Sequence, residues 1–187
     1  MPLLEMRSVT YVHHGRTLTG PVTLALEERG RLAYACGDAF AACALSLIAA
    51  AIVKPSTGTV FIGAFDTRVQ PVHSKRIAGY VQHEAGAHDF TSFTRYIEYR
   101  AALWGLPRAE SIVRARALLT KLDGVHEQFA YPLVGALIAM PQLLVLDRPQ
   151  AAYALSILEA AGGCAIFSTH ADERDAERFA AACGVPA

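Results

Sequence analysis

The chain has 187 residues, of which 53% are hydrophobic and 18% are charged, so it can bury a sizeable core and is not an intrinsically disordered segment. The 17 Lys and Arg residues balance the 17 Asp and Glu residues, so the chain has no net positive charge that would favour nucleic acid as a partner. The four cysteines show no CxxC spacing and no histidines follow them at zinc-ligand spacing, so no metal site is expected.

The N-terminus, MPLLEMR, lacks the apolar segment of a secretory signal, and none is expected. The longest apolar stretch runs from Ala39 to Val53, which is shorter than the roughly 20 residues of a bilayer span. It is interpreted as a buried helix of an α/β protein, and the cysteines as small, mostly buried hydrophobes in a reducing cytoplasm.

The first part of the chain favours strands. Apolar residues alternate from Leu4 to Tyr11 and again from Val22 to Leu26, as in half-exposed antiparallel strands. The segments predicted next are a strand at 31–35, a loop at 37–42, a helix at 42–53, a helix-breaking turn at 54–58 and a strand at 59–62.

The remainder alternates helices with apolar strands. The predicted elements are a strand at 77–81, helices at 92–103 and 108–122, a short helix at 133–140, a strand at 143–146, a helix at 155–161, a strand at 164–168 and a helix at 171–183. The apolar face of the 108–122 helix is predicted to contain Ile112, Val113, Ala117, Leu118 and Leu122. This order predicts a mostly parallel sheet with helices on both faces, preceded by an antiparallel β piece.

Six segments, in the right order, resemble the ATP-binding cassette of ABC transporters. They are RGR at 29–31, KPSTGTVFIG at 54–63, RIAGYVQHE at 76–84, SFTRYIEYRAALWGLP at 92–107, MPQLLVLDRP at 140–149 and CAIFSTHADERDAERFA at 164–180. The resemblance covers about residues 4–179. It implies a P-loop NTPase-like α/β cassette that forms one domain over residues 1–187. An N-terminal antiparallel β subdomain and a shortened helical subdomain at about 88–135 are expected within it.

The P-loop position departs from the family pattern GxxxxGK[ST]. Glycines in that pattern let backbone N–H groups wrap the phosphates, the Lys neutralises phosphate charge, and the hydroxyl ligates magnesium. By the resemblance, Gly37 is the only glycine retained, while Ala42, Cys43 and Ala44 replace the second Gly, the Lys and the Ser/Thr. Asp38 adds a negative charge where phosphates would lie.

The other motif positions are altered to different degrees. Asp147 matches the Walker B Asp, but Arg148 stands where the family has its catalytic Glu, and an arginine cannot take a proton from water at neutral pH. The Q-loop Gln position falls on His83, unless the alignment slips by one residue to Gln82. His170 retains the switch-histidine pattern, and Tyr11 lies where the family places a ring against adenine, although a lone strand Tyr is more often simply packed.

Two further motifs have no counterpart. The stretch in place of the signature sequence reads LDGVHEQ at 122–128, and the stretch after Walker B reads PQAAY at 149–153. Since the resemblance implies that each ATP site joins the P-loop of one subunit to the signature of the other, even an intact partner would be left without a complete composite site.

The resemblance therefore predicts a catalytically degenerate cassette subunit, a scaffold or regulatory partner of a membrane permease and/or another ABC ATPase subunit, or a homodimer. ATP hydrolysis by this chain is not expected, and Asp147 and His170 are remnants. No cofactor is expected, with weak binding of ATP and magnesium at Tyr11, Gly37, Cys43, Ala44 and His83 left open. The expected location is cytoplasmic, peripheral to the inner face of the membrane. The alternatives are an atypical ATPase subunit that energises transport and a non-transport regulator that keeps only the fold.

The aromatic residues of the 92–106 segment are the candidate contact with the membrane partner. Exposed aromatic side chains suit an interface, whereas buried ones belong to a core. The sequence leaves both interpretations open for Phe93, Tyr96, Tyr99 and Trp104.

Overall fold

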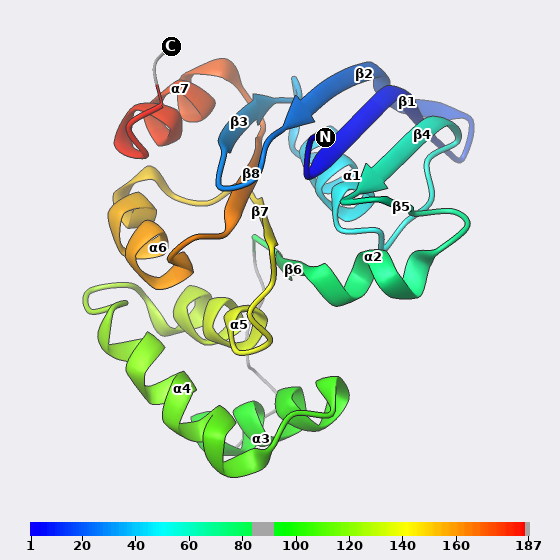
Figure 1. Cartoon of the computed structure of the whole chain (residues 1–187). Coiled ribbons are helices and arrows are strands. Elements are labelled where there is room, and N and C mark those ends of the chain that lie inside the picture. Colours follow the sequence, from blue (N-terminus) through cyan, green and yellow to red (C-terminus); the bar gives the residue numbers. More distant parts are fainter. Residues whose placement is uncertain (84–91, 186–187) are drawn as a thin grey trace.

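A computed structural model describes residues 1–83 and 92–185 (Figure 1). The last residue of the predicted Q-loop segment, Glu84, the start of the predicted helical subdomain at about 88 and the end of the predicted domain at 186–187 lie outside the described residues. The described elements are β1 (Leu4–His13), β2 (Arg16–Leu26), β3 (Arg31–Ala35), α1 (Ala39–Ala49), β4 (Thr57–Ile62), β5 (Phe65–Asp66), α2 (Pro71–Ile77), β6 (Ala78–Val81), α3 (Phe93–Trp104), α4 (Arg108–Thr120), α5 (Glu127–Leu137), β7 (Leu143–Asp147), the 3-10 turn η1 (Ala151–Tyr153), α6 (Ala154–Ala161), β8 (Ala165–His170) and α7 (Glu173–Ala182).

The strands form two sheets, as the sequence predicted. One is antiparallel with the order β2-β1-β4-β5, and the other is parallel with the order β3-β8-β7-β6. Every residue of β7 and β8 is buried, which explains why these strands read as apolar runs without alternation.

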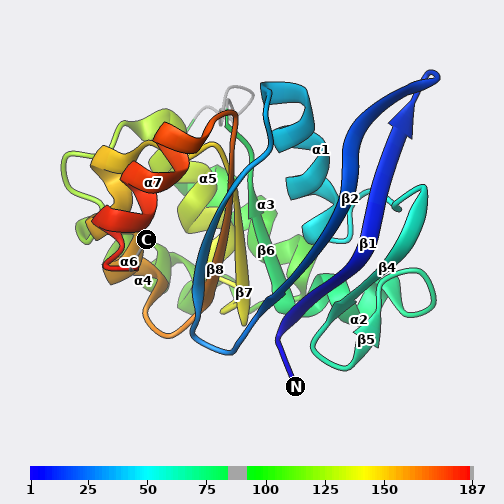
Figure 2. The same ribbon diagram turned by 90° about the horizontal axis from the view of Figure 1, so that it is seen from above.

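Helix α1 lies between the two sheets (Figure 2). Its Leu45 and Ile48 join one core cluster with Leu4 and Met6 of the antiparallel sheet and Phe167 of the parallel sheet. Because α1 is covered from both sides, it needs apolar or small residues nearly all round, which accounts for its alanine-rich sequence.

The opposite face of the parallel sheet is covered by α5, α6 and α7, and α3 and α4 pack on α5 (Figures 1 and 2). A second core cluster fills this side. At the crossing of α3 and α5, a Cβ atom added to Gly135 would lie 2.4 Å from the hydroxyl oxygen of Tyr96 and 2.8 Å from two of its ring carbons. A glycine at 135 therefore sets how closely the two helices approach.

Two helices begin earlier than the sequence predicted. Helix α1 starts at Ala39 instead of Ala42 because Asp38 caps it, and its side chain accepts a hydrogen bond from the backbone N–H of Ala41. Helix α5 starts at Glu127 instead of Leu133 and accommodates Pro132 inside it. The imidazole of His126 serves as its N-cap, accepting from the N–H of Gln128.

The predicted apolar face of α4 was wrong in part. Val113 is 70% exposed and Ala117 is also exposed. Ser111 and Ala115 are buried instead, and Ile112, Leu118 and Leu119 pack against the core beside them. These positions recur at helical spacing, so the buried stripe is rotated relative to the predicted one.

The short elements β5 and α2 were not predicted from the sequence. Only one residue of α2, Ser74, is buried, so the helix offers no apolar periodicity to detect. Within 1–83 and 92–185, no helix combines the length and the apolar character needed to span a bilayer.

Candidate nucleotide site

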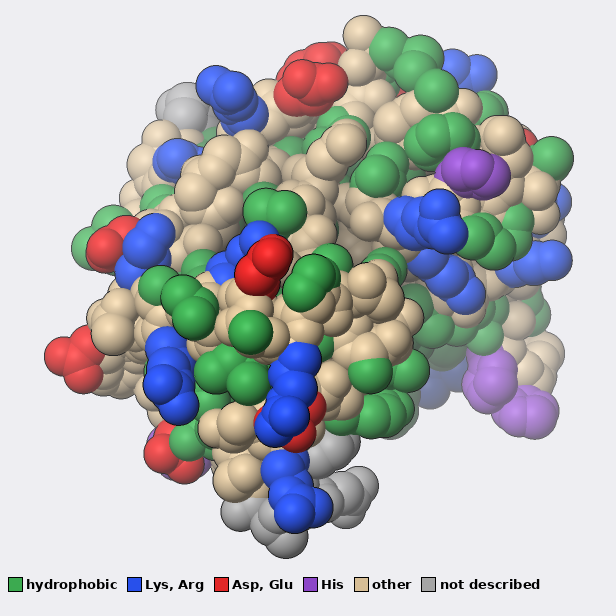
Figure 3. All heavy atoms as spheres, turned by 60° about the horizontal axis from the view of Figure 1, so that its bottom comes forward, with side chains coloured by type: hydrophobic (Ala, Val, Ile, Leu, Met, Phe, Trp, Pro, Cys, Tyr) green, Lys and Arg blue, Asp and Glu red, His purple; other side chains and the backbone are tan. Residues whose placement is uncertain are grey.

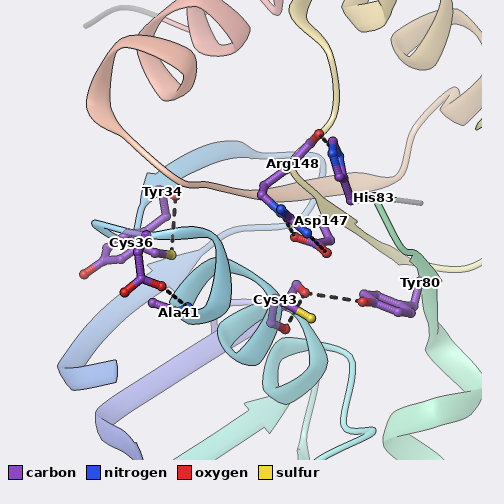
Figure 4. A network of polar contacts seen from close by, with 10 residues as sticks. Tyr34, Cys36, Ala41, Cys43, Tyr80, His83, Asp147 and Arg148 are labelled. Atoms are coloured by element: carbon purple, nitrogen blue, oxygen red, sulfur yellow. Dashed lines mark hydrogen bonds and ion pairs between the residues drawn. The ribbon is translucent and has the colours of Figure 1, made fainter. Parts of the chain in front are cut away.

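The predicted site residues gather at the carboxyl ends of β3 and β7 and at the start of α1. Gly37 and Asp38 follow β3, Cys43 lies in α1, and Asp147 ends β7 (Figure 4). Ligands of open α/β sheets bind outside the carboxyl ends of the strands, so this edge is the expected place for a nucleotide.

The carboxylate of Asp38 caps the first turn of α1. Oδ1 of Asp38 accepts a hydrogen bond of 2.8 Å from the N–H of Ala41, and Oδ2 lies 3.7 Å from Nη2 of Arg16. The free N–H groups of a helix start are what a P-loop offers to phosphate. Here the carboxylate of Asp38 uses one of them and adds a negative charge beside the rest. The partner Arg16 was not identified from the sequence, because it lies in β2, far away along the chain.

Cys43 and Ala44, which the resemblance matches to the P-loop Lys and Ser/Thr, carry no positive charge and no hydroxyl. Ala44 is buried and Cys43 is half-buried. Loss of solvent around Cys43, together with the nearby charge of Asp147, raises the pKa of its thiol, so the thiol stays neutral. Burial likewise raises the pKa of Tyr80 to about 12, against the opposing effect of a hydrogen bond with Ser46 on α1, whose Oγ lies 3.5 Å from the Tyr80 hydroxyl.

Arg148 folds back onto the carboxylate of its neighbour. Its Nε donates to Oδ1 of Asp147 at 2.9 Å and its Nη2 donates to Oδ2 at 3.2 Å (Figure 4). Asp147 is only 1% exposed, so the guanidinium satisfies a carboxylate that water does not reach. The backbone of Arg148 has φ of +48°, an unusual conformation for a residue with a Cβ, and its N–H donates to the carbonyl of Thr169 at 2.8 Å.

His83 also reaches this position. It follows β6, is exposed, and its Nδ1–H donates to the carbonyl oxygen of Arg148 at 3.0 Å. His83, Asp147, Arg148 and Cys43 thus lie close together (Figure 4).

His170 ends β8 and is turned into the interior. It is 2% exposed, its Nε2 and Oγ of Ser168 lie 3.0 Å apart in a hydrogen bond, and its ring packs on Phe179 of α7. Loss of solvent lowers the pKa of His170 to about 4, against the opposing pull of Asp175, Asp172 and Asp147. The imidazole is therefore neutral near pH 7 and engaged with core partners.

Tyr11 lies in β1, opposite Thr19 of β2, and its ring stacks on His13 with 6.1 Å between ring centroids. It belongs to the antiparallel sheet, apart from the cluster around Asp147. This placement agrees with the packed or half-exposed strand tyrosine that the sequence also allowed.

A cavity of about 540 Å³ adjoins Arg148. Its lining includes His83, His126, Gln128, Phe129, Arg148, Gln150 and Tyr153. Residues of the 122–128 and 149–153 stretches line it together; the resemblance matches these stretches to the signature and to the segment after Walker B. Among the residues of 1–83 and 92–185, no group of three or more His, Cys, Asp and Glu side chains could hold a metal ion.

Solved structures of ABC transporter ATP-binding subunits share the fold of this chain. The ATP-binding subunit of an ABC transporter matches with a TM-score of 0.71 and 18% identity, over 90% of this chain and 79% of that chain. The subunit cbiO1 from Clostridium perfringens, part of the ABC transporter complex cbiONQ, matches with a TM-score of 0.69 and 16% identity, over 90% and 78%. A dimeric ATP-binding cassette in a post-hydrolysis state, bound to ADP and phosphate, matches with a TM-score of 0.74 and 15% identity, over 94% and 90%.

The chain has the ABC ATP-binding cassette fold. The predicted fold class, an antiparallel sheet followed by a mostly parallel sheet flanked by helices, is thereby confirmed. No protein-family model matches the chain. At these identities the likeness concerns the cassette fold alone, and the chemistry of the site rests on the residues described above.

Proposed function

We propose that this chain is a catalytically degenerate cassette subunit, a scaffold or regulatory partner of a membrane permease and/or another ABC ATPase subunit. The observation that carries the proposal is that side chains of this chain occupy the two places where phosphate and magnesium would bind. Asp38 supplies a carboxylate at the start of α1, and Arg148 supplies a guanidinium to Asp147.

Asp38 and Arg148 oppose different parts of nucleotide binding. A phosphate arriving at α1 would meet the negative charge of Asp38 and would find neither a lysine nor a hydroxyl at positions 43 and 44. A magnesium ion approaching Asp147 would have to displace a guanidinium that donates two hydrogen bonds to this buried carboxylate. Weak ATP binding is the most that this arrangement favours.

Hydrolysis is disfavoured separately. Arg148 stands where the resemblance implies a carboxylate that polarises the attacking water, and its guanidinium stays protonated at all relevant pH values. The neutral, buried His170 is engaged with Ser168 and Phe179. We therefore assign no catalytic residue.

The proposed partners follow from the fold and from the α3–α4 surface, defined here as Tyr99, Leu103 and Val113. Structures with the same fold include a part of an ABC transporter complex and a dimeric cassette. Tyr99 is 49%, Leu103 61% and Val113 70% exposed. Hydrophobic and basic side chains are interspersed over this side of the molecule (Figure 3).

Of the four aromatic residues considered from the sequence, Tyr99 is the exposed one. Tyr96 is buried, Phe93 packs on Tyr131 and Trp104 is half-buried.

Capture experiments test the scaffold role. The full chain should retain a membrane permease or an intact homologous cassette in a pull-down, and Leu103→Asp should weaken retention of the permease. Leu155→Asp is the matched control, since Leu155 is as exposed as Leu103 but lies on α6. A chain that stays monomeric and retains neither partner would refute the scaffold role and leave the non-transport regulator.

A further inference from the structure

We infer that a second cavity, at the amino-terminal edge of the parallel sheet, is a binding site for a small organic anion with an apolar body. This basal cavity has a volume of about 540 Å³. Its lining includes Gln142 and Cys164, which directly precede β7 and β8, and Arg29, which lies two residues before β3. It therefore lies at the end of the sheet opposite the candidate nucleotide site, and it does not depend on the function proposed above.

Two guanidinium groups converge on the basal cavity. Arg114 of α4 is held in place by donating from Nη1 to the carbonyl oxygen of Ile138 at 2.6 Å. Nε of Arg29 lies beside Gly163, 3.9 Å from where a Cβ atom of residue 163 would be. Glu28 contributes the one carboxylate of the described lining, and within residues 1–83 and 92–185 it forms no ion pair. Two cations against one anion favour a ligand with a negative charge.

Besides the polar Gln142, the wall has an apolar part. It is formed by Leu3, Leu118, Leu137, Pro141, Ala160 and Ala161. A concave site of several hundred Å³ with an apolar lining and a few convergent polar groups is the usual form of a small-molecule site. Charge and lining together select a carboxylate or phosphate monoester that carries a hydrocarbon group.

Backbone strain at the same place supports the inference. Arg29 has φ of +60° and Met140 has φ of +52°, and both line the basal cavity. Side chains other than glycine occupy this left-handed region at a cost of about 1 kcal/mol or more, and such residues cluster at ligand sites. The strained turns place the side chains of Arg29 and Met140 at the cavity.

Cys164 supplies a local reporter. Its thiol donates to the carbonyl oxygen of Pro141 at 2.8 Å, and burial raises the pKa of the thiol, so Cys164 is neutral and does not repel an anion. A ligand in the basal cavity would cover it. Slower labelling of Cys164 by a maleimide would then report occupancy without any measurement of nucleotide binding.

The probe for the experiment is decanoate, a ten-carbon carboxylate, titrated calorimetrically into the full chain. We expect saturable binding of one decanoate per chain and slower labelling of Cys164, with no binding of inorganic phosphate, which lacks the apolar body. Arg29→Ala and Arg114→Ala should each weaken decanoate binding about tenfold, because each removes a charge-assisted hydrogen bond. Arg116→Ala is the matched control, since Arg116 is an exposed α4 arginine outside the described lining, and binding should be unchanged.

A variant that fills the basal cavity with a larger side chain tests the inference independently. Gly163→Phe meets no neighbour closer than 3.9 Å at its Cβ, and its ring would occupy the basal cavity, so decanoate binding should be lost while the melting temperature is retained. Equal binding of decyltrimethylammonium, or undiminished decanoate binding in both Gly163→Phe and the Arg29→Ala variant, would overturn the inference.

Discussion

At the scale of single residues, the site is governed by how buried charges are compensated. Asp147 is a carboxylate without access to water, and such a group needs a cation or must take up a proton. The adjacent Arg148 supplies that cation through two hydrogen bonds, at the expense of a left-handed backbone. We propose that Arg148, which the resemblance places at the position of the catalytic Glu, both removes that base and compensates the remaining carboxylate.

Removing the guanidinium should therefore destabilise the protein. Arg148→Ala leaves Asp147 buried and unpaired, and we expect the free energy of unfolding to fall by about 3 kcal/mol, measured by urea denaturation at pH 7. Arg178→Ala is the control, because it breaks only an exposed pair with Asp175 and should cost less than about 0.5 kcal/mol. Equal, small losses in the two variants would show that the Asp147–Arg148 pair is unimportant for stability.

His170 should make stability depend on pH. Its pKa is about 4 in the folded chain against 6.5 in the unfolded one, so the unfolded state binds the proton first. The stability that the neutral imidazole contributes is present above pH 6.5 and is lost as the pH falls toward 4, by about 3 kcal/mol. His170→Gln keeps a polar group near Ser168 without the titration, and its stability should fall less over this range. Parallel pH profiles of the two proteins would contradict the assignment.

At the scale of elements, most of the architecture could be predicted from the sequence. The strands β3, β7 and β8 were placed to within two residues because continuous apolar runs between turn residues leave few alternatives. Helix α3 was predicted to end at residue 103 and ends at Trp104, where Gly105 caps it with φ of +65°. Helix α2 was missed because only Ser74 on it is buried, so the apolar pattern was absent even though Pro71 begins it.

The site could be predicted in part. The alignment placed Cys43, Asp147, Arg148 and His83, and the structure gathers these four, because motif positions at strand ends are fixed by chain order. The alignment could not reveal that Arg16 approaches Asp38 or that His170 turns toward Phe179. Both contacts depend on side-chain directions across elements, which periodicity does not determine.

Close packing of α3 on α5 gives a prediction at this scale. Gly135→Ala would bring a Cβ within 2.8 Å of two carbons of the buried Tyr96 ring, so α3 and α5 must separate, and we expect a loss of about 2 kcal/mol by thermal unfolding. Shortening the opposing side chain in the double variant Gly135→Ala/Tyr96→Leu should recover part of the loss. Gly163→Ala, which meets no close neighbour, should change stability by less than about 0.5 kcal/mol. A stable Gly135→Ala protein would mean that Tyr96 repacks freely.

The P-loop position can be repaired independently of the rest of the site. Ala42→Gly, Cys43→Lys and Ala44→Ser together restore the groups that hold phosphate and magnesium, so ATP affinity should rise by about tenfold or more. Hydrolysis should stay absent because Arg148 remains in place of a carboxylate. Phosphate release by this triple variant would show that the catalytic position has been misassigned.

At the scale of the whole molecule, the two sheets and helix α1 between them form the cassette fold. The carboxylates of Asp38 and Asp147 at its candidate site are paired with groups of the same chain. The core clusters on either side of the parallel sheet depend on apolar packing and make no use of a nucleotide. Helices α3 and α4 lie away from the antiparallel sheet (Figure 1), and Tyr99, Leu103 and Val113 on them are exposed. We propose that this architecture is maintained for contacts with partner proteins.

The central claim is tested most directly by titrating labelled ATP into the purified chain, with and without magnesium, and measuring bound nucleotide at equilibrium. The account predicts weak binding, with a dissociation constant of about 1 mM or higher, and no gain from magnesium, since Arg148 already occupies the carboxylate of Asp147. Saturable binding in the micromolar range that requires magnesium would contradict it and would favour an atypical ATPase subunit.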